Sequence, residues 1–168
     1  FTVEKALEFI KTAASKNYSV GKDVFFGMDV AAESFFNGEE YEIPEQKLNL
    51  NQEAFLNFYS DLLKKFELIY IEDPFYEKDI KGWEMFHKEF GSKLMVVADD
   101  LVVTNPKFLE KAVEKKLANA VIVKPNQVGT LTETLDFIKM AQKAKMELCV
   151  SHRSGDTAED TFIADLAL

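Results

Sequence analysis

Residues 94–124 read LMVVADDLVVTNPKFLEKAVEKKLANAVIVK. The stretch contains two short apolar runs, residues 94–98 and 120–123, and each run is followed directly by a charged residue. Between the runs, Asn-Pro at 105–106 is typical of a helix start, with asparagine as the N-cap and proline in the first turn. A helix is therefore predicted from there to about Leu117. The stretch as a whole predicts a strand, a helix and a second strand parallel to the first.

The same unit recurs on both sides of this stretch. Apolar runs at residues 24–28, 68–71 and 148–150 predict three more strands. A small hairpin is predicted at residues 41–50, after the turn signal Asn37-Gly38. The spacing of apolar residues, with possible caps at Asn51 and Thr130, predicts helices over residues 2–16, 51–66, 79–90 and 130–144, and a last helix that begins near Asp160.

Five predicted strands thus alternate with helices, and the strands look apolar on both faces. This pattern is typical of a parallel sheet covered by helices. An open doubly wound sheet and a (β/α) barrel both fit it, but no Gly-x-Gly-x-x-Gly follows a strand, which disfavours the dinucleotide-binding version. Because a complete barrel has eight strands in about 250 residues, five strands would be about two-thirds of one. The pattern therefore predicts an α/β fold, with an open doubly wound sheet and a partial TIM-type barrel both open at this point. The first residue is not Met and the last residues stop in mid-pattern, so we expect a fragment of a longer chain.

The composition restricts partners and location. The 168 residues contain 20 Lys+Arg and 29 Asp+Glu, a net charge of −9. A surface this acidic repels phosphate backbones and acidic membranes, so nucleic acid is not an expected partner. The single cysteine, Cys149, cannot form an internal disulfide. No run approaches the ~18 apolar residues of a membrane span, and no signal peptide is visible, so we expect a cytoplasmic protein.

A polar group follows each predicted strand. Since the carboxyl ends of parallel barrel strands lie on one rim, these groups should converge there. Three carboxylates on one rim repel one another unless a cation neutralises them, and oxygen ligands favour Mg²⁺ over Ca²⁺ or Mn²⁺. Zinc is disfavoured because it prefers histidine and cysteine ligands, and the chain has only two histidines, of which His87 lies in a predicted helix away from the strand ends. In chain order the groups are Asp29, Glu72, Asp99, Lys124 and the run Ser151, His152, Arg153, Ser154.

Lys124 and the run at 151–154 suggest a reaction. A lysine beside a cation and partly desolvated has a lowered pKa, which makes Lys124 a candidate general base. Arg153 and Ser154 suit a phosphate or a carboxylate. A metal, a base and an anion clamp together indicate proton abstraction beside a carboxylate, with the metal stabilising an enolate-like intermediate. An isolated aspartate at a strand end is usually a cap or turn former. Asp73 and Asp100 each lie one residue beyond a strand-end acid, and we expect them to cap or to support the ligands from behind.

Five ordered motifs closely resemble the enolase (phosphopyruvate hydratase) family across essentially the whole chain. The resemblance implies a Mg²⁺-dependent glycolytic lyase for the reversible dehydration of 2-phosphoglycerate to phosphoenolpyruvate. The motifs are GMDVAA at 27–32, IEDPF at 71–75, DDLVVTNP at 99–106, KPNQVGTLTET at 124–134 and SHRSG at 151–155.

The resemblance also assigns roles to individual residues. Lys124 matches the base that takes the C2 proton. Arg153 and Ser154 match the phosphate-binding pair, and Ser151 and His152 line the substrate pocket, to which Glu72, Asp99 and Lys124 also belong. The metal ligands implied for Mg²⁺ are Asp29, Glu72 and Asp99.

The resemblance further implies that residues 1–168 are the central part of the family's C-terminal barrel domain. The N-terminal capping domain, the general-acid glutamate and the last barrel strands would then lie outside this chain, so we expect the isolated fragment to be inactive. The parent is expected to be a homodimer or octamer. The chain departs from the family pattern at Glu33-Ser34, at Ala98 and at Ala158, which looks like an insertion near the anion clamp.

Two alternatives remain open on the sequence. One is another enolase-superfamily enzyme, which abstracts a proton alpha to a different carboxylate and would not be expected to carry the clamp at residues 151–154. The other is a non-catalytic enolase-like scaffold or binding protein, which needs neither metal nor substrate affinity.

Overall fold

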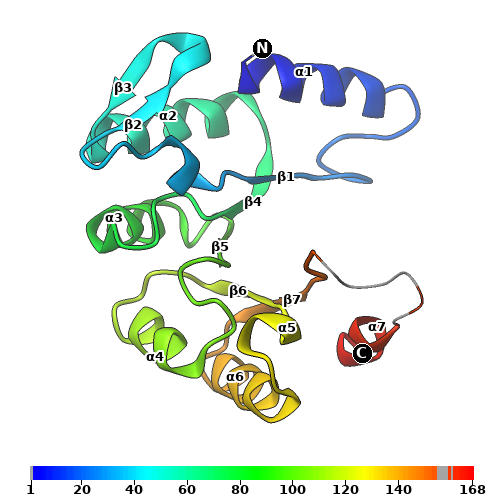
Figure 1. Cartoon of the computed structure of the whole chain (residues 1–168). Helices are drawn as coiled ribbons and strands as arrows, with labels where there is room; N and C mark the ends of the chain where they lie inside the picture. The colour runs from blue at the N-terminus through cyan, green and yellow to red at the C-terminus, as the bar shows by residue number, and fades with distance from the viewer. Residues whose placement is uncertain (1, 155–158, 160) are drawn as a thin grey trace.

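The computed structural model describes residues 2–154, 159 and 161–168. Its main sheet has five parallel strands in the order β1-β4-β5-β6-β7, so the order of strands in this sheet follows their order in the chain. Figure 1 shows the curved sheet with the helices that connect its strands. This arrangement confirms the predicted α/β fold, a partial TIM-type barrel. The strands are β1 (Phe26–Asp29), β4 (Leu68–Glu72), β5 (Met95–Ala98), β6 (Ala120–Val123) and β7 (Glu147–Val150).

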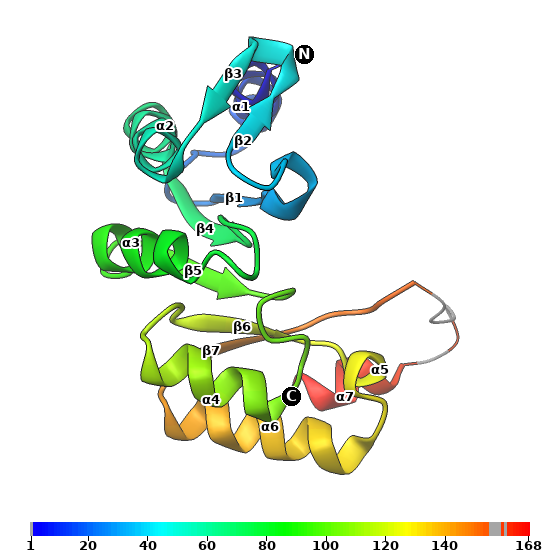
Figure 2. The ribbon, with the colours of Figure 1, turned by 60° about the vertical axis from the view of Figure 1, so that its left-hand side comes forward.

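The connecting helices lie along the outer side of the sheet (Figure 2). Their starts follow local sequence signals. The side chains of Asn51, Asn105 and Thr130 accept backbone N–H groups of the first turn, as predicted, and Asp79 does the same for Gly82. None of the helices in the described part of the chain is long and apolar enough to cross a membrane. The larger helices are α1 (Val3–Ala14), α2 (Gln52–Lys65), α3 (Ile80–Phe90), α4 (Pro106–Glu114) and α6 (Leu131–Lys143).

An aromatic cluster fills the space between the sheet, α2 and α3. Tyr59 packs edge-on against Phe86, with ring centroids 5.0 Å apart, and its hydroxyl donates to the Pro74 carbonyl at 2.7 Å. Tyr41 reaches the same cluster from the predicted hairpin, which is confirmed as antiparallel β2 (Tyr41–Ile43) and β3 (Leu48–Leu50). The short 3₁₀ helix η1 (Ala32–Phe35) precedes the hairpin, and a second one, η2 (Pro44–Gln46), lies in the connection between its two strands.

Two features differ from the sequence predictions. The expectation that every strand is apolar on both faces holds for β6, whose four residues are all buried, but exposure alternates along the edge strands β1 and β7. Edge strands lack one neighbour, and part of their surface stays open to solvent. A short helix, α5 (Pro125–Val128), follows β6 and was not predicted, while α7 (Phe162–Leu166) is the expected last helix.

Asn119 clamps the start of β6 to β5. Its side-chain oxygen accepts from the Val96 backbone N–H at 2.8 Å, and its amide donates to the carbonyls of Gly91 at 2.8 Å and Leu94 at 3.0 Å. Asn119→Ala leaves these backbone groups unpaired, and we expect the free energy of unfolding to fall by about 2–4 kcal/mol in urea titrations. The exposed Asn49→Ala should change it by about 0.5 kcal/mol or less. Equal effects of the two substitutions would contradict the clamp.

Candidate metal and proton-transfer site

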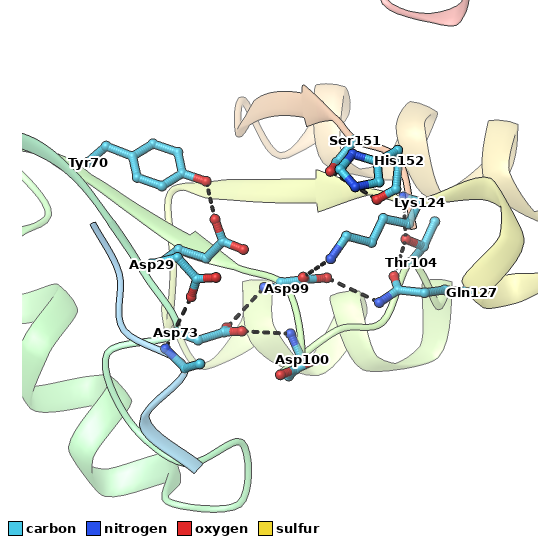
Figure 3. Close-up of polar contacts among 12 residues, drawn as sticks. Asp29, Tyr70, Asp73, Asp99, Asp100, Thr104, Lys124, Gln127, Ser151 and His152 are labelled. Atoms are coloured by element: carbon cyan, nitrogen blue, oxygen red, sulfur yellow. Dashed lines mark hydrogen bonds and ion pairs between the residues drawn. The ribbon is translucent and has the colours of Figure 1, made fainter. Parts of the chain in front are cut away.

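The carboxyl ends of the parallel strands meet at one edge of the sheet, as the strand order requires. Asp29 ends β1 and Glu72 ends β4, and these two residues are direct partners in the parallel register. Asp99 follows β5 and Lys124 follows β6. Figure 3 shows Asp29, Asp99 and Lys124 gathered at this edge, with Ser151 nearby. Groups up to 122 positions apart in sequence therefore share one region of the molecule.

Three carboxylates form a close group at this edge. Glu72, Asp73 and Asp99 each offer an oxygen, and these oxygens lie within 4.8 Å of one another. The donor set contains oxygen and neither sulfur nor imidazole, which suits a hard cation such as Mg²⁺. Two of the predicted ligands belong to this group. Asp29 lies outside it, and its Oδ1 accepts the Ala31 backbone N–H at 3.1 Å.

Asp73 organises the loop that carries Asp99. The residue is 5% exposed, and its two carboxylate oxygens accept the backbone N–H groups of Asp99 and Asp100, each at 3.0 Å. This is the capping role expected from the sequence. Burial raises the pKa of Asp73 to about 7, against the opposing effect of these two N–H donors.

Tyr70 is a site residue that the sequence reasoning missed. Its hydroxyl donates to Oε2 of Glu72. The pKa of Glu72 is raised, mainly by burial and further by the charges of Asp29 and Asp99, while the hydrogen bond from Tyr70 lowers it. Side chains two positions apart in a strand share a face, so the pattern Tyr70-Ile71-Glu72 contained a signal for this contact.

Lys124 contacts Asp99 directly. Its ammonium group forms an ion pair with Oδ2 of Asp99, while Oδ1 accepts from the Gln127 amide at 3.1 Å. Burial lowers the pKa of Lys124, but the hydrogen bond and charge of Asp99, with the charge of Glu72, outweigh it and raise the pKa. The sequence expectation of a lowered pKa concerned a lysine beside a bound cation. The charges of the chain itself raise the pKa of Lys124 instead.

The residues after β7 form the remaining side of this edge. The Ser151 backbone N–H donates to the Val123 carbonyl at 3.0 Å, which extends the pairing of β6 with β7 beyond the strand. His152, Arg153 and Ser154 are exposed. Ala158, the expected insertion, lies outside the described residues. The anion-binding roles of Arg153 and Ser154 remain predictions.

Comparison with known proteins gives one consistent result. A family model described as the enolase C-terminal TIM barrel domain matches residues 2–168. Enolase 2 of Lactobacillus johnsonii is 46% identical over 98% of this chain and 39% of its own length. The enolases of Ehrlichia chaffeensis and Ehrlichia canis are each 39% identical, over 98% and 99% of this chain. The chain spans 38–39% of the length of these relatives.

Proposed function

Because the chain belongs to the enolase family, we propose that it is the central part of the barrel domain of a phosphopyruvate hydratase. The whole protein would interconvert 2-phosphoglycerate and phosphoenolpyruvate in the cytoplasm, as a homodimer or octamer. The observation that carries this proposal is the contact between Lys124 and Asp99 at the edge where Glu72 also lies. A base candidate thus lies beside carboxylates that suit a cation, which supports proton abstraction from a single bound substrate.

We propose that Asp29, Glu72 and Asp99 hold Mg²⁺. The side-chain oxygens of Glu72 and Asp99 are close enough for a shared ion, and Asp29 is the register partner of Glu72. A bound Mg²⁺ supplies positive charge that neutralises these carboxylates and the negative charge that develops on the substrate carboxylate.

The remaining residues bind substrate and move the proton. When the charges of Asp99 and Glu72 are neutralised, the interactions that raise the Lys124 pKa are lost, and its neutral amine takes the proton from C2 of 2-phosphoglycerate. The C2 electron pair then forms the C2–C3 double bond as hydroxide leaves C3. Arg153 and Ser154 hold the phosphate, with Ser151 and His152 beside it. The acid that protonates the leaving hydroxide is not among the matched residues of this chain, so we propose that the isolated fragment is inactive.

The test is an assay of the whole protein that follows phosphoenolpyruvate by its ultraviolet absorbance. We expect turnover that EDTA abolishes and Mg²⁺ restores, while the fragment of residues 1–168 gives none. Turnover of a different carboxylate acid alone would favour another enolase-superfamily enzyme. Absence of both Mg²⁺ and phosphoglycerate binding in calorimetry would favour a non-catalytic scaffold. Robust turnover by the fragment would contradict its proposed inactivity.

A further inference from the structure

Thr104 is buried beside the site and connects two of its segments. Its side chain, in the loop between β5 and α4, has no exposed surface. Its hydroxyl oxygen accepts the Lys124 backbone N–H at 2.9 Å, and its hydroxyl proton is donated to Oε1 of Gln127, also at 2.9 Å. Figure 3 shows Thr104 between Lys124 and Gln127. A single hydroxyl therefore contacts the residue that carries the candidate base and the first turn that follows it.

These contacts fix the orientation of the Gln127 amide. The Asp99 carboxylate can only accept, so the Gln127 atom that faces Oδ1 of Asp99 at 3.1 Å is the NH₂ group. The carbonyl oxygen of Gln127 therefore faces Thr104, whose hydroxyl donates its proton to it while its oxygen accepts the Lys124 backbone N–H. The hydrogen bonds run in one direction from Thr104 to the Asp99 carboxylate.

Each oxygen of the Asp99 carboxylate has one partner in this arrangement. Its side chain is 8% exposed, Oδ2 pairs with Lys124, and Oδ1 takes the Gln127 amide. Asp73 holds its backbone N–H. Without the Gln127 donor, Oδ1 loses the partner that fixes the rotation of the carboxylate about its terminal bond, while Lys124 remains attached to Oδ2 alone.

The backbone at Thr104 adopts an unfavourable conformation that keeps the hydroxyl in this place. Val103 has φ 42° and Thr104 has φ 54°, in the left-handed region that β-branched residues rarely occupy. The turn is closed by the Val103 N–H donating to the Asp99 carbonyl at 2.7 Å. Strain of this kind persists where the surroundings determine the conformation, and it concentrates at functional sites.

We propose that Thr104 and Gln127 are positioning residues for the proton transfer, a role that rests on the proposed function. Thr104 orients the Gln127 amide and anchors the backbone of Lys124. Gln127 fixes the Asp99 carboxylate. Together they hold the base and the proposed metal ligand in one relative geometry without contacting substrate.

The test compares variants of the whole protein. Thr104→Val keeps the shape of the side chain and removes the hydroxyl. We expect its kcat to fall about 10–100-fold, as for other partners that orient metal ligands, with the KM for 2-phosphoglycerate changed less than about threefold. Thr104→Ser, which restores the hydroxyl, should recover kcat to within about threefold of the wild type. Thr134→Val is the matched control, since Thr134 is equally buried but its hydroxyl donates to the carbonyl of Thr130, the N-cap of α6.

Gln127→Met provides an independent variant in case the valine substitution prevents folding. It should lower kcat in the same way and shift the ¹³Cγ resonance of Asp99, while Thr134→Val leaves both unchanged. The inference is overturned if Gln127→Met changes neither kcat nor the ¹³Cγ resonance of Asp99, or if Thr104→Ser loses as much activity as Thr104→Val. If the wild-type protein has no turnover, the proposed function fails, and an unshifted Asp99 resonance in Gln127→Met then overturns the positioning role separately.

Discussion

Lys124→Met is expected to slow exchange of the C2 hydrogen of 2-phosphoglycerate with solvent by orders of magnitude in the whole protein. A positioned general base accelerates a reaction by about 10²–10⁴-fold, so the exchange rate should fall by that factor. Methionine keeps the length and packing of the lysine stem and removes the amine. Transfer of deuterium from D₂O into C2, followed by proton NMR, measures the exchange directly and does not depend on the later loss of hydroxide.

Two further variants distinguish the role of Lys124 as a base from its role in the ion pair with Asp99. Lys124→Arg keeps a positive charge beside Asp99 but cannot lose its proton near neutral pH, so it should be as defective in exchange as Lys124→Met while retaining more stability. Lys139→Met, on the exposed side of α6, should exchange at the wild-type rate. Exchange by Lys124→Arg at a near-normal rate would remove Lys124 from the base role.

The helices and strands of this fold could be predicted from the sequence because their signals are local. The run at residues 120–123 matches β6 to the residue, and the caps at Asn51, Asn105 and Thr130 act within their own first turns. Parallel order then placed the strand ends on one edge without any knowledge of contacts. These signals concern residues within a few positions of each other, which is what periodicity and capping can report.

The contacts around Asp99 could not be predicted from the sequence because they join residues that are far apart in the chain. Thr104 and Gln127 are 23 positions apart, and the bond between them depends on two consecutive left-handed residues that no sequence rule predicts for Val103 and Thr104. Asp73 illustrates the same limit. Adjacent residues in a strand face opposite sides, but Asp73 has φ 43°, which interrupts the alternation and brings its carboxylate close to that of Glu72.

Asp99→Asn is expected to weaken Mg²⁺ binding by the whole protein at least about 100-fold. Loss of a partner that merely orients a ligand costs about 10–100-fold, and removal of a charged ligand should cost more. The amide keeps the shape of the side chain. Because the Asp99 charge contributes to the raised pKa values of Glu72, Asp73 and Lys124, all three should shift down in the variant. Calorimetric titration with MgCl₂ measures the affinity.

Asp100→Asn is the matched control for this experiment. It removes the same charge one position farther along the loop, and its backbone N–H can still donate to Asp73. A nearby charge that does not ligate the ion acts through the field alone, so its loss should weaken binding about tenfold or less. A large difference between the two variants therefore separates ligation from general attraction. If Asp99→Asn and Asp100→Asn weaken binding equally, Asp99 is not a ligand, and the proposed metal site at this edge of the sheet is wrong.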